Sequence, residues 1–388
     1  MLGAPFLATD NPVINSRPPV KRNPEPSLEG LGKASINWHA LHNDTRCKMM
    51  LLLPVLLILL ACLASLRLTG WFRRYALTHL LLDVPNSRSS HTIATPRGGG
   101  ISIVLSTVLP LVVLGATHWL AWPTVLSVCG GGALVALVGL VDDRGHVSPR
   151  WRLIGHFAAA VWVVATLGAP PLKIMGIGIS QGWFVSTVAV LYLVWMLNLT
   201  NFMDGIDGIA GTEVITVCGC SVFLSTVAAP GKMLWVAPLV LASATLGFLV
   251  WNWPPAKIFM GDAGSGFVGL TLAVLSLQAG WASNSLWWSW VILLGVFIVD
   301  ATFTLIRRLS LGERFYKAHC SHAYQHAAVR RGHLPVTMAV GIINLCWLFP
   351  VALWVALGWL DGLLGVLLAY APLVVAAVRL DAGRSSTA

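Results

Sequence analysis

The chain has 388 residues, of which 56% are hydrophobic and only 10% are charged, whereas an ordinary soluble domain has about 25% charged residues. With a mean hydropathy of +0.77, this composition excludes a water-soluble globule, a disordered chain and a coiled coil, and it indicates a protein embedded in lipid. The 25 Lys and Arg exceed the 15 Asp and Glu and give a net charge of +10. In a membrane protein this excess indicates loops retained in the cytoplasm, so we expect no nucleic-acid partner.

Residues 1–48 are polar, rich in proline and without apolar periodicity, and they are predicted to be a disordered tail. Met49 and Met50 then open an apolar run at once. We interpret the tail as a mis-assigned start, an extension upstream of a translation start near Met49. A tail that belongs to the native protein is the alternative, and N-terminal sequencing distinguishes the two.

Beyond the tail, eleven apolar runs have about the length that crosses ~30 Å of hydrocarbon as a helix. Because backbone groups in lipid must be satisfied within the segment, the predicted fold is all-α, a polytopic integral membrane helical bundle of about eleven transmembrane helices over residues 49–380. The runs are 50–68, 99–118, 123–141, 153–169, 184–201, 211–229, 233–250, 265–281, 286–306, 335–357 and 362–379.

The basic residues set the predicted orientation. Seventeen Lys and Arg fall in one set of connections, and the opposite loops hold only Lys173 and Lys232. By the positive-inside rule the first set faces the cytoplasm. It comprises the connections 67–98, 142–152, 202–210, 251–264 and 307–334 and the C-terminal tail 381–388, with Arg379 just before that tail as the seventeenth.

Acidic residues gather on the same predicted side, in three separate loops that carry Asp142 and Asp143, Asp204 and Asp207, and Asp262. Ionisable groups at the membrane are costly and usually functional. Carboxylates that converge from different helix ends suit a hard divalent cation, most simply Mg²⁺, with Mn²⁺ as a substitute. Magnesium in turn suits a diphosphate, because it bridges phosphate oxygens.

Two motifs extend this pattern. Asn198, Asn201 and Asp204 are spaced i, i+3, i+6 and form one stripe of a helix; polar contacts between helices are the structural alternative. The glycine-rich turn 261–266 enters a helix, where free N–H groups favour an anion, and its Asp262 could hold a metal beside a phosphate.

Basic groups near the acids are candidates for binding anions, although the positive-inside rule alone would also place them here. Arg88, Arg97 and Arg152 are of this kind, and Arg97 precedes three glycines that could form a backbone cradle. In the loop 307–334, His322 and His326 could share a helix face, without the Glu of a zinc motif, and are predicted to contact phosphate. A solvated amphipathic loop is the alternative.

The ordered motifs resemble the polyprenyl-phosphate N-acetylhexosamine-1-phosphate transferase family over residues 80–330. The resemblance is carried by Asp83-Val-Pro-Asn-Ser-Arg-Ser-Ser-His91, Thr95-Pro-Arg-Gly-Gly-Gly100, Asp142-Asp143-Arg144, Asn201-Phe-Met-Asp-Gly-Ile-Asp-Gly208 and Gly261-Asp-Ala-Gly-Ser265. It implies transfer of a sugar 1-phosphate from a UDP-N-acetylhexosamine to undecaprenyl phosphate, with release of UMP. The expected location is the bacterial inner membrane, with the active site on its cytoplasmic face. A homodimer is one expected form of the protein.

The resemblance also implies roles for single residues. Asp262 would be the main Mg²⁺ ligand with Asn201 nearby, and Asp142 and Asp143 would act catalytically beside the lipid phosphate. A nucleotide- or sugar-binding role falls to Asn198, Asp204, Asp207, Arg88 and Arg97, and a phosphate-binding role to Arg152, His322 and His326.

The histidine loop departs from part of the family, since it reads His322-Ala-Tyr-Gln-His326 instead of the adjacent histidines of the peptidoglycan translocase. The pattern is closer to the branch that initiates O-antigen or related polysaccharides with UDP-N-acetylfucosamine or UDP-GlcNAc. The rival class is a transporter or flippase for an anionic solute, which should place ionisable groups near the bilayer midplane.

Overall fold

The computed structural model describes residues 45–85, 93–145, 147–179, 181–313 and 320–384, with side chains from residue 51 onward. The chain divides into two units, residues Met1–Leu51 and Leu52–Ala388. Of the first unit only the helical residues 45–51 are described, so the predictions for residues 1–44 and for Arg88 lie outside the described residues.

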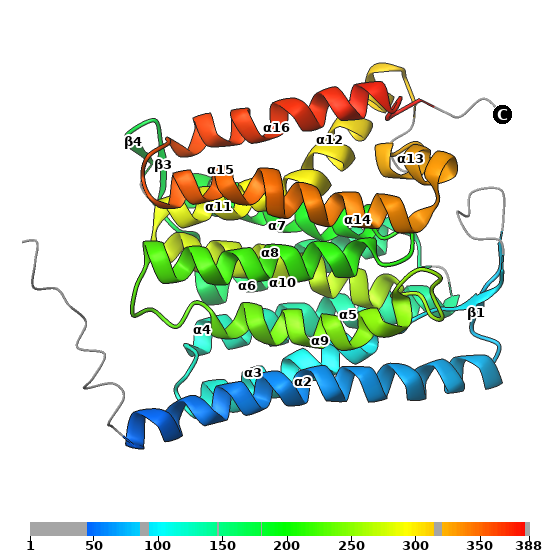
Figure 1. The fold of residues 1–388 in the computed structure, drawn as a ribbon, viewed down its shortest axis with the longest axis horizontal. Coiled ribbons are helices and arrows are strands. Elements are labelled where there is room, and N and C mark those ends of the chain that lie inside the picture. The colour runs from blue at the N-terminus through cyan, green and yellow to red at the C-terminus, as the bar shows by residue number, and fades with distance from the viewer. Residues whose placement is uncertain (1–44, 86–92, 146, 180, 314–319, 385–388) are drawn as a thin grey trace, which may run out of the picture. The chain divides into compact units, whose positions relative to one another are not determined.

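Helices make up most of the described residues (Figure 1). They are α2 (Thr45–Thr78), α3 (Ile101–Ala116), α4 (Trp122–Leu126), η2 (Ser127–Gly131), α5 (Gly132–Gly145), α6 (Pro149–Leu167), α7 (Trp183–Met203), α8 (Ile209–Ala228), α9 (Val236–Asn252), α10 (Asp262–Ala282), α11 (Asn284–Leu293), α12 (Gly295–Ser310), α13 (Ala323–Arg331), α14 (His333–Ile343), η3 (Asn344–Leu348), α15 (Phe349–Ala356) and α16 (Gly362–Arg379). Two short antiparallel hairpins pair β1 (Leu82–Asp83) with β2 (Thr95–Pro96) and β3 (Leu172–Ile174) with β4 (Ile177–Ile179).

The predicted polytopic helical bundle is confirmed. Among the described residues, seven helices are long and apolar enough to cross a membrane, and α11 with α12, bent by 66°, makes an eighth if the pair is one span. The other predicted runs fall on α3 and α9, which have 16 and 17 residues, and on α6, whose first turn carries Arg150 and Arg152. The predicted count of about eleven is reached only if these three helices also cross.

Helix α10 is the centre of the bundle. In an 18-residue stretch of α10, 94% of the residues are buried, against 17% in a stretch of the same length in α2. Helix α10 packs against α5, α7 and α11. Small residues allow this approach, as is usual between helices in membranes. A Cβ on Gly139 of α5 would lie 2.4 Å from the Ala263 nitrogen, and a Cβ on Gly100 would lie 2.4 Å from the Gly264 Cα.

Because most helices alternate in direction, their polar ends collect at one end of the bundle, which we call the site end. Helices α5, α7 and α9 end there, and α6, α8 and α10 begin there. In Figure 1 the site end is on the right, with β1 and α13, and the β3–β4 hairpin lies at the opposite end. The three acidic loops predicted to lie on one side are therefore brought to one end.

The contact between α5 and α10 can be tested with two matched glycines. We expect Gly139→Ala to lower the thermal stability of the detergent-solubilised protein, because its Cβ would meet the backbone of Ala263. Gly219→Ala, also inside a helix but with nothing within 4 Å of its added Cβ, should leave stability unchanged or raise it by up to about 1 kcal/mol. Equal melting temperatures for the two variants would contradict the close approach.

Candidate active site

Asp142 and Asp143 end α5 side by side in sequence, but their carboxylates have different partners. Asp142 accepts from the Val147 amide at 2.8 Å and from Arg152 Nη1 at 2.7 Å. Asp143, with a side chain only 6% exposed, pairs with Arg97. The pair of acids therefore serves two separate contacts and is not one shared ligand.

Asp143 caps the first turn of α10. Its carboxylate accepts from the amide of Asp262 at 3.1 Å and from that of Ala263 at 3.3 Å, where the positive end of a helix dipole favours an anion. The turn 261–266 was predicted to offer these amides to a phosphate, but Asp143 already occupies them. Asp143 thus holds the helix that carries Asp262.

The glycines after Arg97 are likewise engaged by the protein. The amides of Gly99 and Gly100 donate to the carbonyls of Phe259 and Met260 at 2.9 and 2.8 Å. The amides of Gly99 and Gly100 are therefore not available to a phosphate, because they complete a contact with the segment before α10. Burial opposes the charge on Arg97, but its hydrogen bond to Asp143 raises the pKa of the guanidinium above its ordinary value.

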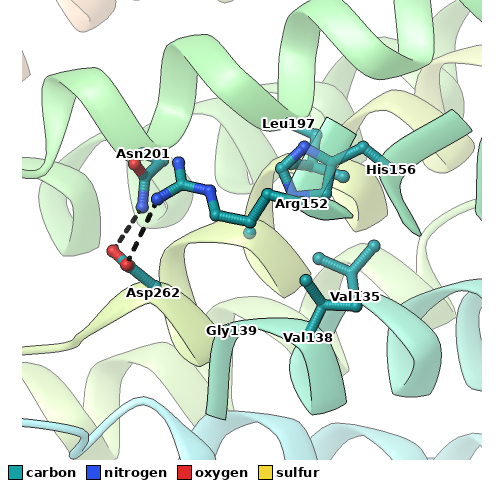
Figure 2. A pocket seen from close by; sticks show the side chains of 9 residues that line it. Val135, Val138, Gly139, Arg152, His156, Leu197, Asn201 and Asp262 are labelled. Atoms are coloured by element: carbon teal, nitrogen blue, oxygen red, sulfur yellow. Dashed lines mark hydrogen bonds and ion pairs between the residues drawn. The ribbon is translucent and has the colours of Figure 1, made fainter. Parts of the chain in front are cut away.

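A second cluster joins α5, α6, α7 and α10 (Figure 2). Arg152 Nη1, which binds Asp142, also lies 3.6 Å from Asp262 Oδ2. Asn201 Nδ2 donates to Asp262 Oδ1 at 2.8 Å and to Ser265 Oγ at 2.9 Å. Two residues predicted from separate motifs, Arg152 and Asn201, thus contact Asp262, whose side chain is 29% exposed.

A small pocket opens beside this cluster (Figure 2). It is lined by Val135, Val138, Gly139, Arg152, His156, Leu197, Asn201, Asp262 and Gly266. Its lining combines apolar side chains with the ionic groups. His156 lies one turn after Arg152 and is 6% exposed. It interacts with Asn198, whose predicted role in binding nucleotide or sugar stays a prediction.

Asp204 follows the last residue of α7 and is only partly exposed. Burial raises the pKa of its carboxyl well above the ordinary value, and the negative charges of Asp262, Asp143 and Asp207 raise it further. No donor contacts this carboxylate within the described part of the chain. Such a group is stabilised in its ionised form by a bound cation.

Asp207 makes structural contacts. Its carboxylate lies 3.2 Å from His333 Nδ1 and accepts from the Ala256 amide at 3.0 Å, and its carbonyl accepts from Thr337 Oγ1 at 2.7 Å. These contacts join the loop after α7 to α14 and to the loop after α9. The predicted nucleotide-binding role of Asp207 stays a prediction.

The two predicted histidines of the 307–334 loop differ in their hydrogen-bond partners. His322 is 3% exposed, and its Nδ1 lies 3.3 Å from Asp300 Oδ1. His326 is on α13, and its buried Nε2 has no hydrogen-bond partner among the described residues. His326 is therefore better placed than His322 to bind an added group.

Two residues that the sequence motifs missed fix α13 in place. The Asp300 carboxylate accepts from the amides of Ala323 and Tyr324, both at 2.9 Å. The Tyr324 hydroxyl donates to the Phe202 carbonyl at 2.8 Å, and a Cβ on Gly205 would collide with it. An acid inside a predicted span was the one available signal, and it pointed to Asp300 only.

The carboxylates fit a metal that arrives with its substrate. Among the described residues, no group of three or more His, Cys, Asp or Glu is arranged to hold a metal ion by itself. Magnesium, however, is usually bound by one or two carboxylates together with substrate phosphates. Asp262 and Asp204 offer such oxygens, and the clustering of negative charge around Asp204 favours a cation. Asn201 presents N–H groups to Asp262 and so supports that carboxylate; its role as a ligand stays a prediction.

An apolar helical bundle with a charged site at one end defines a multi-pass membrane protein whose site lies at its helix ends. Residues 125–280 match glycosyl transferase family 4. The chain is 31% identical over 261 residues to the probable undecaprenyl-phosphate N-acetylglucosaminyl 1-phosphate transferase of Bacillus subtilis, covering 66% of this chain and 72% of the relative.

Two further relatives agree. The decaprenyl-phosphate N-acetylglucosaminephosphotransferase of Mycobacterium tuberculosis (strain H37Rv) is 30% identical over 315 residues, 71% of this chain and 77% of the relative. The undecaprenyl-phosphate alpha-N-acetylglucosaminyl 1-phosphate transferase of Thermotoga maritima is 28% identical over 270 residues, 67% and 77% of the two chains. The chain belongs to glycosyl transferase family 4, among the polyprenyl-phosphate N-acetylhexosamine-1-phosphate transferases.

The different contacts of the two adjacent acids give a prediction. Removing one partner of a fully buried ion pair costs about 3–5 kcal/mol. Because the Arg97 side chain is 32% exposed, Asp143→Ala should lower the midpoint of thermal inactivation by a smaller amount, up to about 5 °C. Asp142→Asn should leave that midpoint within about 1 °C, because Arg152 keeps Asp262 as a partner. Thermal inactivation of both variants in detergent checks this, and an unchanged midpoint for Asp143→Ala would show that the α10 contact is not structural.

Proposed function

We propose that this protein transfers an N-acetylhexosamine 1-phosphate from a UDP-sugar to undecaprenyl phosphate and releases UMP. The donor is of the GlcNAc or N-acetylfucosamine type, and the product initiates O-antigen or a related cell-envelope polysaccharide. The site faces the cytoplasm from the bacterial inner membrane. The observation that carries the proposal is a cluster at one end of the bundle. In this cluster Arg152 contacts both Asp142 and Asp262, and Asn201 donates to Asp262.

The site must bring together two anions, the lipid phosphate and the sugar diphosphate. Phosphoryl transfer needs mainly positioning and neutralisation of charge. Arg152 is suited to hold the attacking phosphate, because its guanidinium is already placed between Asp142 and Asp262.

In the proposed reaction an oxygen of the lipid phosphate attacks the phosphorus that bears the sugar. A new P–O bond forms there, and the bond from that phosphorus to the oxygen of UMP breaks. A phosphate monoester has a second pKa of about 6, so the attacking group is mostly dianionic at pH 7 and needs little help from a base. The main role of Asp142 in this proposal is therefore to position Arg152, and removal of a proton is secondary.

Asp262 and Asp204 are the residues we assign to the metal, Mg²⁺ or Mn²⁺. When bound, the ion neutralises charge on the diphosphate and on the leaving group. Arg97 and Asp143 hold the helix start that presents Asp262. His326 is the α13 residue we assign to the donor, because its Nε2 has no partner among the described residues.

The activity is tested with purified protein, undecaprenyl phosphate, Mg²⁺ and a panel of UDP-N-acetylhexosamines, with UMP measured by chromatography. We expect UMP release with at least one donor, and a fall of about 10³-fold in Asp262→Asn, the size of effect seen when one electrostatic group is removed. Asp361→Asn is the matched control, because Asp361 caps α16 and Asn caps helices about equally well.

Full activity of Asp262→Asn would refute the metal assignment. No UMP with any donor would favour the transporter alternative. That alternative has little support here, since the carboxylates of the site lie at helix ends and not along the middle of the spans.

The raised pKa of Asp204 predicts a pH effect. As the pH falls, a carboxyl with a raised pKa takes up a proton at a higher pH than an ordinary carboxyl does, and this proton competes with the metal. The Mg²⁺ concentration for half-maximal UMP release should therefore rise as the pH falls toward 5, by up to about tenfold per pH unit. In Asp204→Asn the Mg²⁺ concentration for half-maximal UMP release should be high at every pH and should change less with pH. An identical pH dependence in the two proteins would contradict the role of Asp204.

A further inference from the structure

The segment Leu380–Arg384, which follows α16, folds back onto α12. Arg307 Nη1 donates to the Ala382 carbonyl at 2.9 Å, and the Ala382 side chain is fully buried. Gly383 has a φ of +81°, and a Cβ there would lie 2.9 Å from Arg307 Cβ and 3.1 Å from the Thr304 carbonyl oxygen. Glycine is therefore required both by the backbone conformation and by the space.

The same segment holds Ser321, the residue before His322. The Gly383 amide donates to the Ser321 carbonyl at 2.7 Å. On its other side, Ser321 Oγ accepts from Arg308 Nη1 at 3.2 Å, and Arg308 Nη2 pairs with Glu313 at 2.7 Å. Ser321 is 1% exposed and Arg308 4%, so this contact is part of the protein interior and not a surface encounter.

From Ser321 the contacts run on to the acidic site. Ala323 packs in one apolar cluster with Ala377 and Ala382. Tyr324 then donates its hydroxyl to the Phe202 carbonyl, two residues before Asp204. An unbroken series of close contacts therefore joins Gly383 to the loop that bears Asp204.

We propose that the Leu380–Arg384 segment is a positioning element of the active site, which sets the place of the α13 N-terminus and so of His326 and the Asp204 loop. No residue of the segment touches substrate in this proposal. Its effect on turnover rests on the function proposed above, whereas its effect on the order of residues 320–327 does not.

A purely global role in stability is the competing explanation. Among the described residues, the Arg307–Ala382 bond joins the segment to α12 and the Gly383 bond joins it to Ser321, while α13 is also held by Asp300 and Tyr324. Loss of the segment should therefore loosen the chain near Ser321 without unfolding the bundle. This difference makes the two explanations separable by experiment.

The test compares a chain that stops after Leu380 with one that stops after Arg384. The first lacks Ala382 and Gly383, and the second keeps them. A finer pair is Arg307→Leu, which loses the bond to Ala382, and Arg307→Lys, which can still donate; Arg384→Ala is the surface control, because its contact is an exposed pair with Asp381. Amide hydrogen exchange of residues 320–327, the melting temperature, and kcat and KM for the UDP-sugar are measured for each.

We expect the stop after Leu380 and Arg307→Leu to speed exchange in residues 320–327 by about tenfold, the factor for losing one or two ordinary hydrogen bonds. The KM for the UDP-sugar should rise about as much, with a melting temperature close to that of the full chain. Arg307→Lys should recover most of both effects. Arg384→Ala and the stop after Arg384 should match the full chain.

Two results would overturn the proposal. Unchanged exchange in residues 320–327 after loss of the segment would show that it positions nothing. Faster exchange spread evenly over the bundle, with a lowered melting temperature, would assign it to global stability. If the full chain releases no UMP at all, the proposed function fails, but the exchange measurement still decides the role of the segment.

Discussion

The site depends on the abutment of two helix ends, the last turn of α5 on the first turn of α10. Gly139 lets the two backbones meet, and the Asp143 carboxylate then serves as the anion that the start of α10 requires. Asp142 and Asp262 are placed by this same contact, one from each helix, with Arg152 between them. The first N–H groups of a helix have no partner within the helix, and Asp143 supplies one here, so the capping contact and the site form together.

Much of the arrangement could be predicted from the sequence, because its causes are local. Apolar runs of sufficient length predicted the helices, and each predicted run falls on helix. The concentration of acids in three loops predicted one charged site, and Asn201 does contact Asp262. Both signals are local. The residue types at a helix end determine at which end of the bundle those residues lie.

The remainder depends on contacts between segments far apart in the chain. Asp142 and Asp143 are neighbours, and only the position of α10 decides which one becomes its cap. The sequence predicts the amides of Gly99 and Gly100 to be free, yet they donate to carbonyls of the segment before α10. Asp300 and Tyr324 have no motif, because their role arises from where α13 comes to rest.

The burial of α10 has an evolutionary consequence. The carboxylate at its start sits on a helix that is surrounded by protein along nearly all of its length, so few substitutions there are tolerated. Across the site, α13 is short and exposes Val329, Arg330 and Arg331, and its few fixed contacts leave the rest of its surface free to vary. In a scaffold divided in this way, a substitution on the exposed side of α13 disturbs less packing than a substitution around Asp262 does.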